Sequence, residues 1–195
     1  ECIESDGYQR IDTGFYAKNT TKIIFDGEVS FPSGWATIFG SYDSGKWFSM
    51  WSNGTTLYGE FGSQELAIAS VSGRFTVIAD GTNWSCGGAV AVFPSATFTA
   101  TSTAYLFGVN GHTYRTPMKL YGCQIYDNNI LVRDFVPCIN ASGTVGLYDI
   151  VNNKFYANAG SGVFTSGATV NNTPALAVIS YVVSNETDAY PDGKF

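Results

Sequence analysis

Hydrophobic and polar residues alternate along short runs throughout this chain, which is the pattern of half-buried β-strands. Clear runs are TKIIFDGEVSF from residue 21, RFTVIADG from residue 74 and MKLYGCQIYD from residue 118. Asn, Asp and Gly clusters such as SNGT, DGTN and DNN separate the runs and accept the positive φ of tight turns. No stretch keeps the apolar spacing of a helix. About a dozen such runs predict an all-β fold, an antiparallel β-sandwich or jelly roll.

Residues 46–61, KWFSMWSNGTTLYGEF, depart from simple alternation because both faces of the predicted hairpin carry large side chains. One face, read with period two, presents apolar residues suited to the core: Phe48, Met50, Leu57 and Phe61. The opposite face presents three aromatic rings beside a carboxylate: Trp47, Trp51, Tyr58 and Glu60. If this second face is exposed, it predicts a sugar platform, because a pyranose offers an apolar C–H face to aromatic rings. The alternatives are that the rings cover a sheet edge or lie beneath the C-terminal segment.

The 195 residues suit one well-buried domain, which we place at residues 1–168. Residues 169–195 contain a short apolar run followed by a polar tail, and this composition predicts a final edge strand and then a linker to a further segment. The chain begins at Glu1 without Met, so we expect it to be a processed or excised part of a larger protein.

Charge narrows the choice of partners. Only 13% of the residues are charged and the formal net charge is −6, without a basic cluster. Nucleic acid and anionic membrane surfaces are therefore poor partners. No apolar run approaches the roughly 20 residues that a membrane helix requires, so we expect no membrane insertion.

Metal and thiol chemistry have weak support in the sequence. The cysteines, Cys2, Cys86, Cys123 and Cys138, lack the C-x-x-C spacing of zinc sites and read as buried free thiols, with one disulfide as the alternative. Calcium stays open as a less favoured possibility, with Asp43, Asp80 and Asp127, which each lie in a turn, as the candidate ligands. Each aspartate is alone there and better explained as a turn residue, so no cofactor is expected.

The loop GVNGHTYRT offers a second group of candidate ligand-binding residues: Asn110, His112, Tyr114 and Arg115. These side chains could donate to sugar hydroxyls, and Arg115 could hold the carboxylate of an acidic sugar. The alternative is an ordinary solvated loop.

Catalysis is poorly supported. Asp26 and Glu28 project from one face of a strand, and their backbones are about 6.6 Å apart. This spacing is near the separation of the two carboxyl groups in retaining glycosidases. Two solvent-facing carboxylates explain them more simply. A nucleophilic triad has only His112 as a base, and no G-x-S-x-G elbow precedes a helix.

The opening ECIESDGYQRIDTGF, the run GWATIFGS and the long segment YGCQIYDNNILVRDFVPCINASGTVGLYDIVNNKFYANAGSG resemble laminin-G-like, concanavalin A-like jelly-roll domains. Such domains occur in bacteriophage tail proteins and in surface proteins of gut bacteria. The resemblance implies two curved antiparallel sheets and, in most members, glycan binding or attachment. The same superfamily also contains laminarinase-like enzymes, but their E-x-D-x-x-E signature is absent from this sequence.

From these observations we expect a non-catalytic, lectin-like attachment module that binds a cell-surface glycan. We expect it in the virion, in a phage tail or fibre, with a bacterial surface or secreted protein as the alternative, and as part of a larger chain or oligomer. Its ligand would contact Trp47, Trp51, Tyr58, Glu60 and the 110–115 loop. Two other functions stay open: a structural or oligomerisation module that uses the aromatic face as a protein interface, and, less favoured, a glycoside hydrolase.

Overall fold

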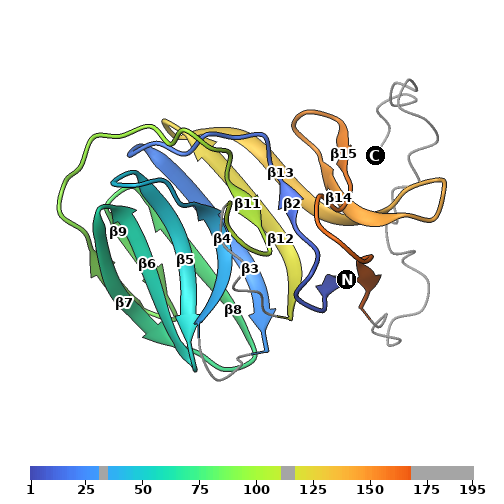
Figure 1. The fold of residues 1–195 in the computed structure, drawn as a ribbon, viewed down its shortest axis with the longest axis horizontal. Coiled ribbons are helices and arrows are strands. Elements are labelled where there is room, and N and C mark those ends of the chain that lie inside the picture. The colour runs from blue at the N-terminus through green and yellow to red at the C-terminus, as the bar shows by residue number, and fades with distance from the viewer. Residues whose placement is uncertain (31–34, 111–116, 168–195) are drawn as a thin grey trace.

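The computed structural model describes residues 1–30, 35–110 and 117–167 as an all-β sandwich of two antiparallel sheets (Figure 1). The predicted fold class is therefore confirmed at the level of the antiparallel β-sandwich. The described residues form no helix that is long and apolar enough to cross a membrane. Residues 168–195, which include the predicted edge strand and linker, lie outside the described residues.

The larger sheet, sheet A, has ten strands in the order β10-β9-β8-β3-β12-β13-β14-β15, with β1 pairing β12 and β16. Its strands are β1 (Ile3–Ser5), β3 (Thr21–Val29), β8 (Arg74–Asp80), β9 (Asn83–Cys86), β10 (Ala89–Val92), β12 (Met118–Asp127), β13 (Ile130–Ile139), β14 (Val145–Asp149), β15 (Lys154–Tyr156) and β16 (Thr165–Ser166). The central strands β3 and β12 pair along nearly their whole length, from Met118 opposite Val29 to Asp127 opposite Thr21.

The smaller sheet, sheet B, has six strands in the order β2-β11-β4-β5-β6-β7. They are β2 (Ile11–Asp12), β4 (Trp35–Ser41), β5 (Trp47–Asn53), β6 (Thr56–Gly62), β7 (Gln64–Ser70) and β11 (Tyr105–Leu106). Strands β4 to β7 form one layer, with β3 and β8 of sheet A in the layer behind (Figure 1). The SNGT turn joins β5 to β6 as the hairpin that the sequence predicts.

Aromatic side chains from both sheets meet in the core. The Phe25 ring of β3 lies 5.5 Å from the Phe39 ring of β4, and the Phe48 ring of β5 lies 5.0 Å from the Trp84 ring of β9. Each fully buried ring of this size contributes about 2–3 kcal/mol through removal of apolar surface from water. Gly59 makes room for this packing, because a Cβ there would lie 2.5 Å from Trp84 Cε3.

The four cysteines are buried and free, as the sequence predicts. Burial raises the pKa of the Cys123 thiol far above its ordinary value, so this thiol stays protonated at neutral pH. Cys123 therefore behaves as a small apolar core residue.

Candidate functional site

Strands β5 and β6 place the predicted aromatic face on the outside of sheet B. Core-facing positions in both strands are fully buried, as predicted: Phe48, Met50, Leu57 and Phe61. On the opposite face the cross-strand register sets Trp51 against Tyr58 and Ser49 against Glu60. The assignment of the two faces from alternation is therefore confirmed, and the candidate residues of this hairpin lie together on one surface.

The largest aromatic group on this surface is a stack of three rings, which we call the Trp51 stack: Trp35, Trp51 and Tyr58. The Trp35 and Trp51 centroids are 4.1 Å apart with planes 17° from parallel, and those of Trp51 and Tyr58 are 4.2 Å apart at 8°. Because β4 and β6 flank β5, these neighbours cover opposite faces of the Trp51 ring. Trp51 is consequently only 5% exposed, whereas Trp35 is 54% exposed. Trp35, which the sequence did not single out, thus offers the accessible ring.

A second pair of stacked rings, Tyr42 and Trp47, lies toward the other end of β5. Their centroids are 5.2 Å apart and their planes are 5° from parallel. Trp47 is half-buried. Two indole N–H groups of this face, Trp47 Nε1 and Trp51 Nε1, are buried without a hydrogen-bond partner among the described residues. Such donors favour a polar group or water that approaches them from outside.

Glu60 lies between the two stacks, opposite Ser49, whose hydroxyl donates a hydrogen bond to its carboxylate. The pKa of Glu60 is raised to about 7, mainly by burial, with the Ser49 hydrogen bond opposing the rise and the nearby charge of Glu65 adding to it. Only 7% of Glu60 is exposed. The carboxylate predicted to sit beside the rings is therefore present, but it lies at the floor of the face and exchanges its proton near neutral pH.

The second predicted group is only partly described. His112, Tyr114 and Arg115 fall outside the described residues. The Asn110 side chain joins two loops, because its Oδ1 accepts from Tyr42 N at 2.9 Å and its Nδ2 donates to Asp43 Oδ1 at 3.5 Å. Asn110 therefore has a positioning role near the Tyr42–Trp47 pair.

The three aspartates considered for calcium are engaged in other contacts. Asp43 accepts from Thr101 N at 2.6 Å and from Ser102 Oγ at 2.6 Å. Asp80 is paired with Lys22 and Asp127 with Lys18. No group of three or more His, Cys, Asp or Glu side chains that could hold a metal occurs in the described parts of the chain.

The acidic pair on β3 has partners that do not suit general acid–base chemistry. Both oxygens of Asp26 accept hydrogen bonds from the Arg74 guanidinium, at 2.8 and 2.6 Å. Glu28 accepts a long hydrogen bond of 3.4 Å from the Tyr121 hydroxyl. Asp26 is thus neutralised by an arginine, and the pair lies on sheet A, away from the aromatic face.

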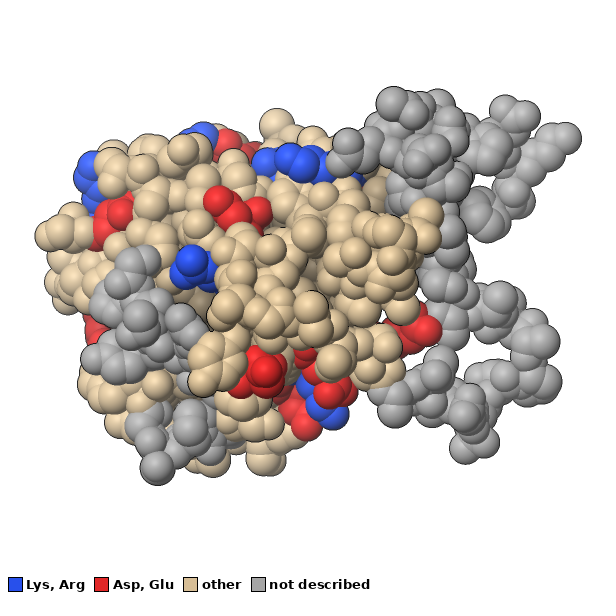
Figure 2. Space-filling model, turned by 45° about the vertical axis from the view of Figure 1, so that its right-hand side comes forward, with Lys and Arg blue, Asp and Glu red and all other residues tan. Residues whose placement is uncertain are grey.

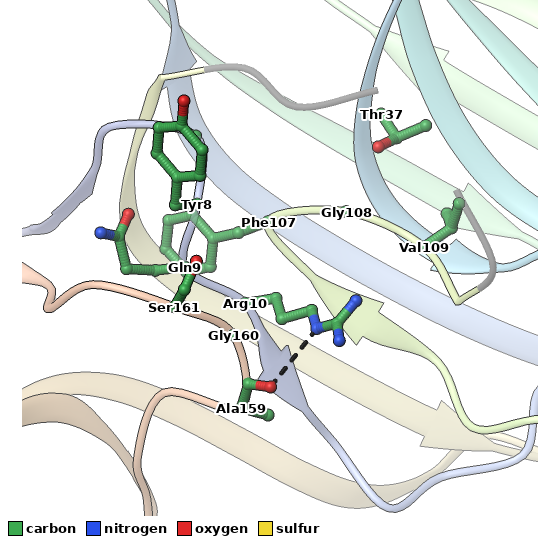
Figure 3. Close-up of a pocket in the computed structure, with 11 residues that line it drawn as sticks. Tyr8, Gln9, Arg10, Thr37, Phe107, Gly108, Val109, Ala159, Gly160 and Ser161 are labelled. Atoms are coloured by element: carbon green, nitrogen blue, oxygen red, sulfur yellow. Dashed lines mark hydrogen bonds between the residues drawn. The ribbon is translucent and has the colours of Figure 1, made fainter. Parts of the chain in front are cut away.

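A pocket of about 290 Å³ lies at the β2 side of sheet B (Figure 3). Thr37 and three chain segments, residues 7–10, 107–109 and 159–161, form its walls. Thr37 also stands directly opposite Trp51 in the pairing of β4 with β5. Thr37 therefore connects the wall of the pocket to the Trp51 stack.

Figure 2 shows charged side chains in small separate groups on the visible face, with uncharged residues between them. No protein-family model matches the chain, and no curated protein is detectably similar to it in sequence.

Proposed function

We propose that the protein is a non-catalytic glycan-binding attachment module that uses the outer face of sheet B. The observation that supports this most strongly is the exposed Trp35 ring, which lies on the nearly parallel ring of Trp51. A flat indole held in this way is pre-organised, so a pyranose can stack on it with little loss of side-chain entropy. The sequence resemblance to laminin-G-like domains supports the same function.

The contact area differs from the sequence-based expectation in one respect. Because both faces of the Trp51 ring are covered, Trp51 holds the stack together, and Trp35, Tyr58 and Trp47 offer the accessible surface. Thr37 and the groups lining the adjacent pocket supply polar partners for sugar hydroxyls. A shallow site of this kind binds weakly as a single copy. Several copies on a phage tail or fibre would raise the avidity about 100-fold or more.

A glycan-array screen of the chain with Trp35→Ala and Tyr126→Ala variants tests this proposal. Tyr126 is a half-buried aromatic on sheet A and serves as the matched control. We expect wild type and Tyr126→Ala to bind the same glycans and Trp35→Ala to lose them. Parallel screens with calcium and with a chelator test whether glycan binding requires calcium.

Absence of binding to any glycan would overturn the proposal. The aromatic face would then be better explained as a protein interface in a structural or oligomerisation module. In that case sedimentation should show a concentration-dependent oligomer that Trp35→Ala dissociates.

A further inference from the structure

The pocket beside the Trp51 stack has walls that are fixed by hydrogen bonds. Asn158 Oδ1 accepts from Arg10 N at 3.0 Å and from Gly160 N at 2.7 Å. Its amide nitrogen donates to the carbonyls of Ser161 and Gly162. Residues 8–10 and 159–161 also exchange backbone hydrogen bonds, from Ala159 N to Arg10 O and from Ser161 N to Tyr8 O. Asn158 therefore holds two sides of the pocket together.

The third wall contains a backbone outlier. Phe107 has φ of +66°, a left-handed conformation that a bulky side chain rarely adopts. Packing holds it there, because its ring lies 4.8 Å from Phe164 and the next residue, Gly108, donates from its amide to Ile38 O. Strained residues of this kind cluster at binding sites, where the surrounding structure keeps them in place.

Arg10 is the only charged residue among the described residues that line this pocket. In Figure 3 its side chain extends away from Gln9, and Nε donates to Ala159 O at a long 3.5 Å. The guanidinium also lies 5.4 Å from the Tyr105 ring centroid. Neither terminal nitrogen has a hydrogen-bond partner among the described residues, so the donors of the planar fork are available.

Arg10 differs from the other two arginines that the structure describes. Arg74 is paired with Asp26 and Arg133 with Asp149, whereas Arg10 forms no ion pair with a described residue. The nearest acidic residues along the chain are used elsewhere: Asp6 accepts from Tyr8 N and Asp12 accepts from Gly14 N. Among the described arginines, Arg10 is therefore the one without an ion pair, and it lines a pocket.

We propose that this pocket binds the carboxylate of an acidic sugar, with the Arg10 guanidinium as the donor. The proposal rests on the glycan-binding function proposed above and names the ligand class. A guanidinium matches a carboxylate with two parallel hydrogen bonds, which no neutral hydroxyl can reproduce. The volume of about 290 Å³ is at the lower end of typical ligand pockets, roughly 300–1,000 Å³, and suits one sugar ring.

Continuity with the aromatic face favours a sugar over another carboxylate. Thr37 lines the pocket and stands opposite Trp51, so a chain of sugars bound at Arg10 can extend onto the exposed Trp35 ring. A peptide carboxylate would use the arginine without needing that platform.

The test is a set of protein-observed NMR titrations with galacturonic acid, its neutral match galactose, and the small carboxylate N-acetylglycine. Wild type is compared with Arg10→Gln, Arg10→Lys and the control Arg74→Gln, which removes the same charge from sheet A. We expect wild type and Arg74→Gln to bind galacturonic acid roughly 10- to 100-fold more tightly than galactose. Arg10→Gln should lose this preference, and Arg10→Lys should keep part of it because it retains the charge without the fork.

Equal affinity of Arg10→Gln and wild type for galacturonic acid would overturn the proposal, and so would N-acetylglycine binding as tightly as the sugar acid. If galactose and galacturonic acid bind equally and both depend on Trp35, the glycan-binding function stands and the carboxylate site falls. If neither sugar binds, the carboxylate site falls, and the glycan array decides the glycan-binding function separately. Unchanged spectra of the free variants establish that each has kept its fold.

Discussion

Thr37 and Trp51 face each other across β4 and β5, and Thr37 also lines the pocket that contains Arg10. This pairing joins the two features of sheet B that we assign to binding. A ligand that extends from the pocket past Thr37 would reach the edge of the Trp51 stack. Changes in the stack and changes in the pocket should therefore affect the same ligand, though by different physical routes.

Substitution of Trp51 should mainly lower stability, whereas substitution of Trp35 should mainly abolish binding. Trp51→Ala removes a ring that is 5% exposed and packed on both faces, so we expect the free energy of unfolding to fall by about 3 kcal/mol. Trp35→Ala removes a ring that is 54% exposed and should cost less than about 1 kcal/mol while abolishing glycan binding. Urea unfolding of both variants measures this. Equal stability of Trp51→Ala and wild type would show that the stack does not hold the face together.

Glu60 should make stability depend on pH. Because burial raises its pKa from the ordinary 4.5 to about 7, the folded state holds the proton more tightly than the unfolded state. This contribution is fully present below about pH 4.5 and is lost as the pH rises through 7, which lowers the free energy of unfolding by about 3 kcal/mol. Urea unfolding across this range measures the loss.

Glu60→Gln keeps a neutral side chain of similar shape in the same place. We expect its stability curve to be flat where that of wild type falls, so the variant should be the more stable protein above pH 8, by an amount on the order of 3 kcal/mol. Parallel curves for the two proteins would show that Glu60 does not titrate in this range.

Gly40 should be required for the close approach of β4 to β5 at Phe48 and Ser49. Its φ is +123°, and a Cβ there would lie 2.1 Å from the Phe48 carbonyl oxygen across β4 and β5. We expect Gly40→Ala to destabilise the protein by roughly 3 kcal/mol or more. Gly45→Ala is the control, because Gly45 also has positive φ but nothing within 4 Å of its Cβ position, and it should cost only about 1 kcal/mol. Similar losses for the two variants, measured by thermal or urea unfolding, would contradict this explanation.

Local alternation was enough to predict the sandwich and the two faces of β5 and β6, because a strand keeps its period of two whatever it packs against. Alternation did not predict the strands whose limits are set by tertiary contacts. Strand β9, which supplies the fully buried Trp84, overlaps a segment that the Asp-Gly-Thr-Asn turn pattern assigned to a loop. The apolar run TAYLFGV, residues 103–109, also predicts a strand, but β11 there is only two residues long because Phe107 turns into the left-handed region.

The candidate site was predictable only in part for the same reason. Trp47, Trp51, Tyr58 and Glu60 are neighbours in one hairpin, so their common face follows from the sequence. Trp35 joins them through strand pairing, which alternation within one run does not reveal. The Arg10 pocket combines segments separated by about 150 positions, and the arginine has no local pattern that distinguishes it from the paired Arg74.

The most direct test of the central claim follows the indole N–H signals of the tryptophans by NMR while a glycan identified by the array is added. Trp84 is the internal control, because it is fully buried and its Nε1 donates to Gly81 O at 2.8 Å. We predict that the signals of Trp35 and Trp51 shift together and that the Trp84 signal does not. A glycan that binds while the Trp35 and Trp51 signals stay unmoved would contradict a binding site on the outer face of sheet B.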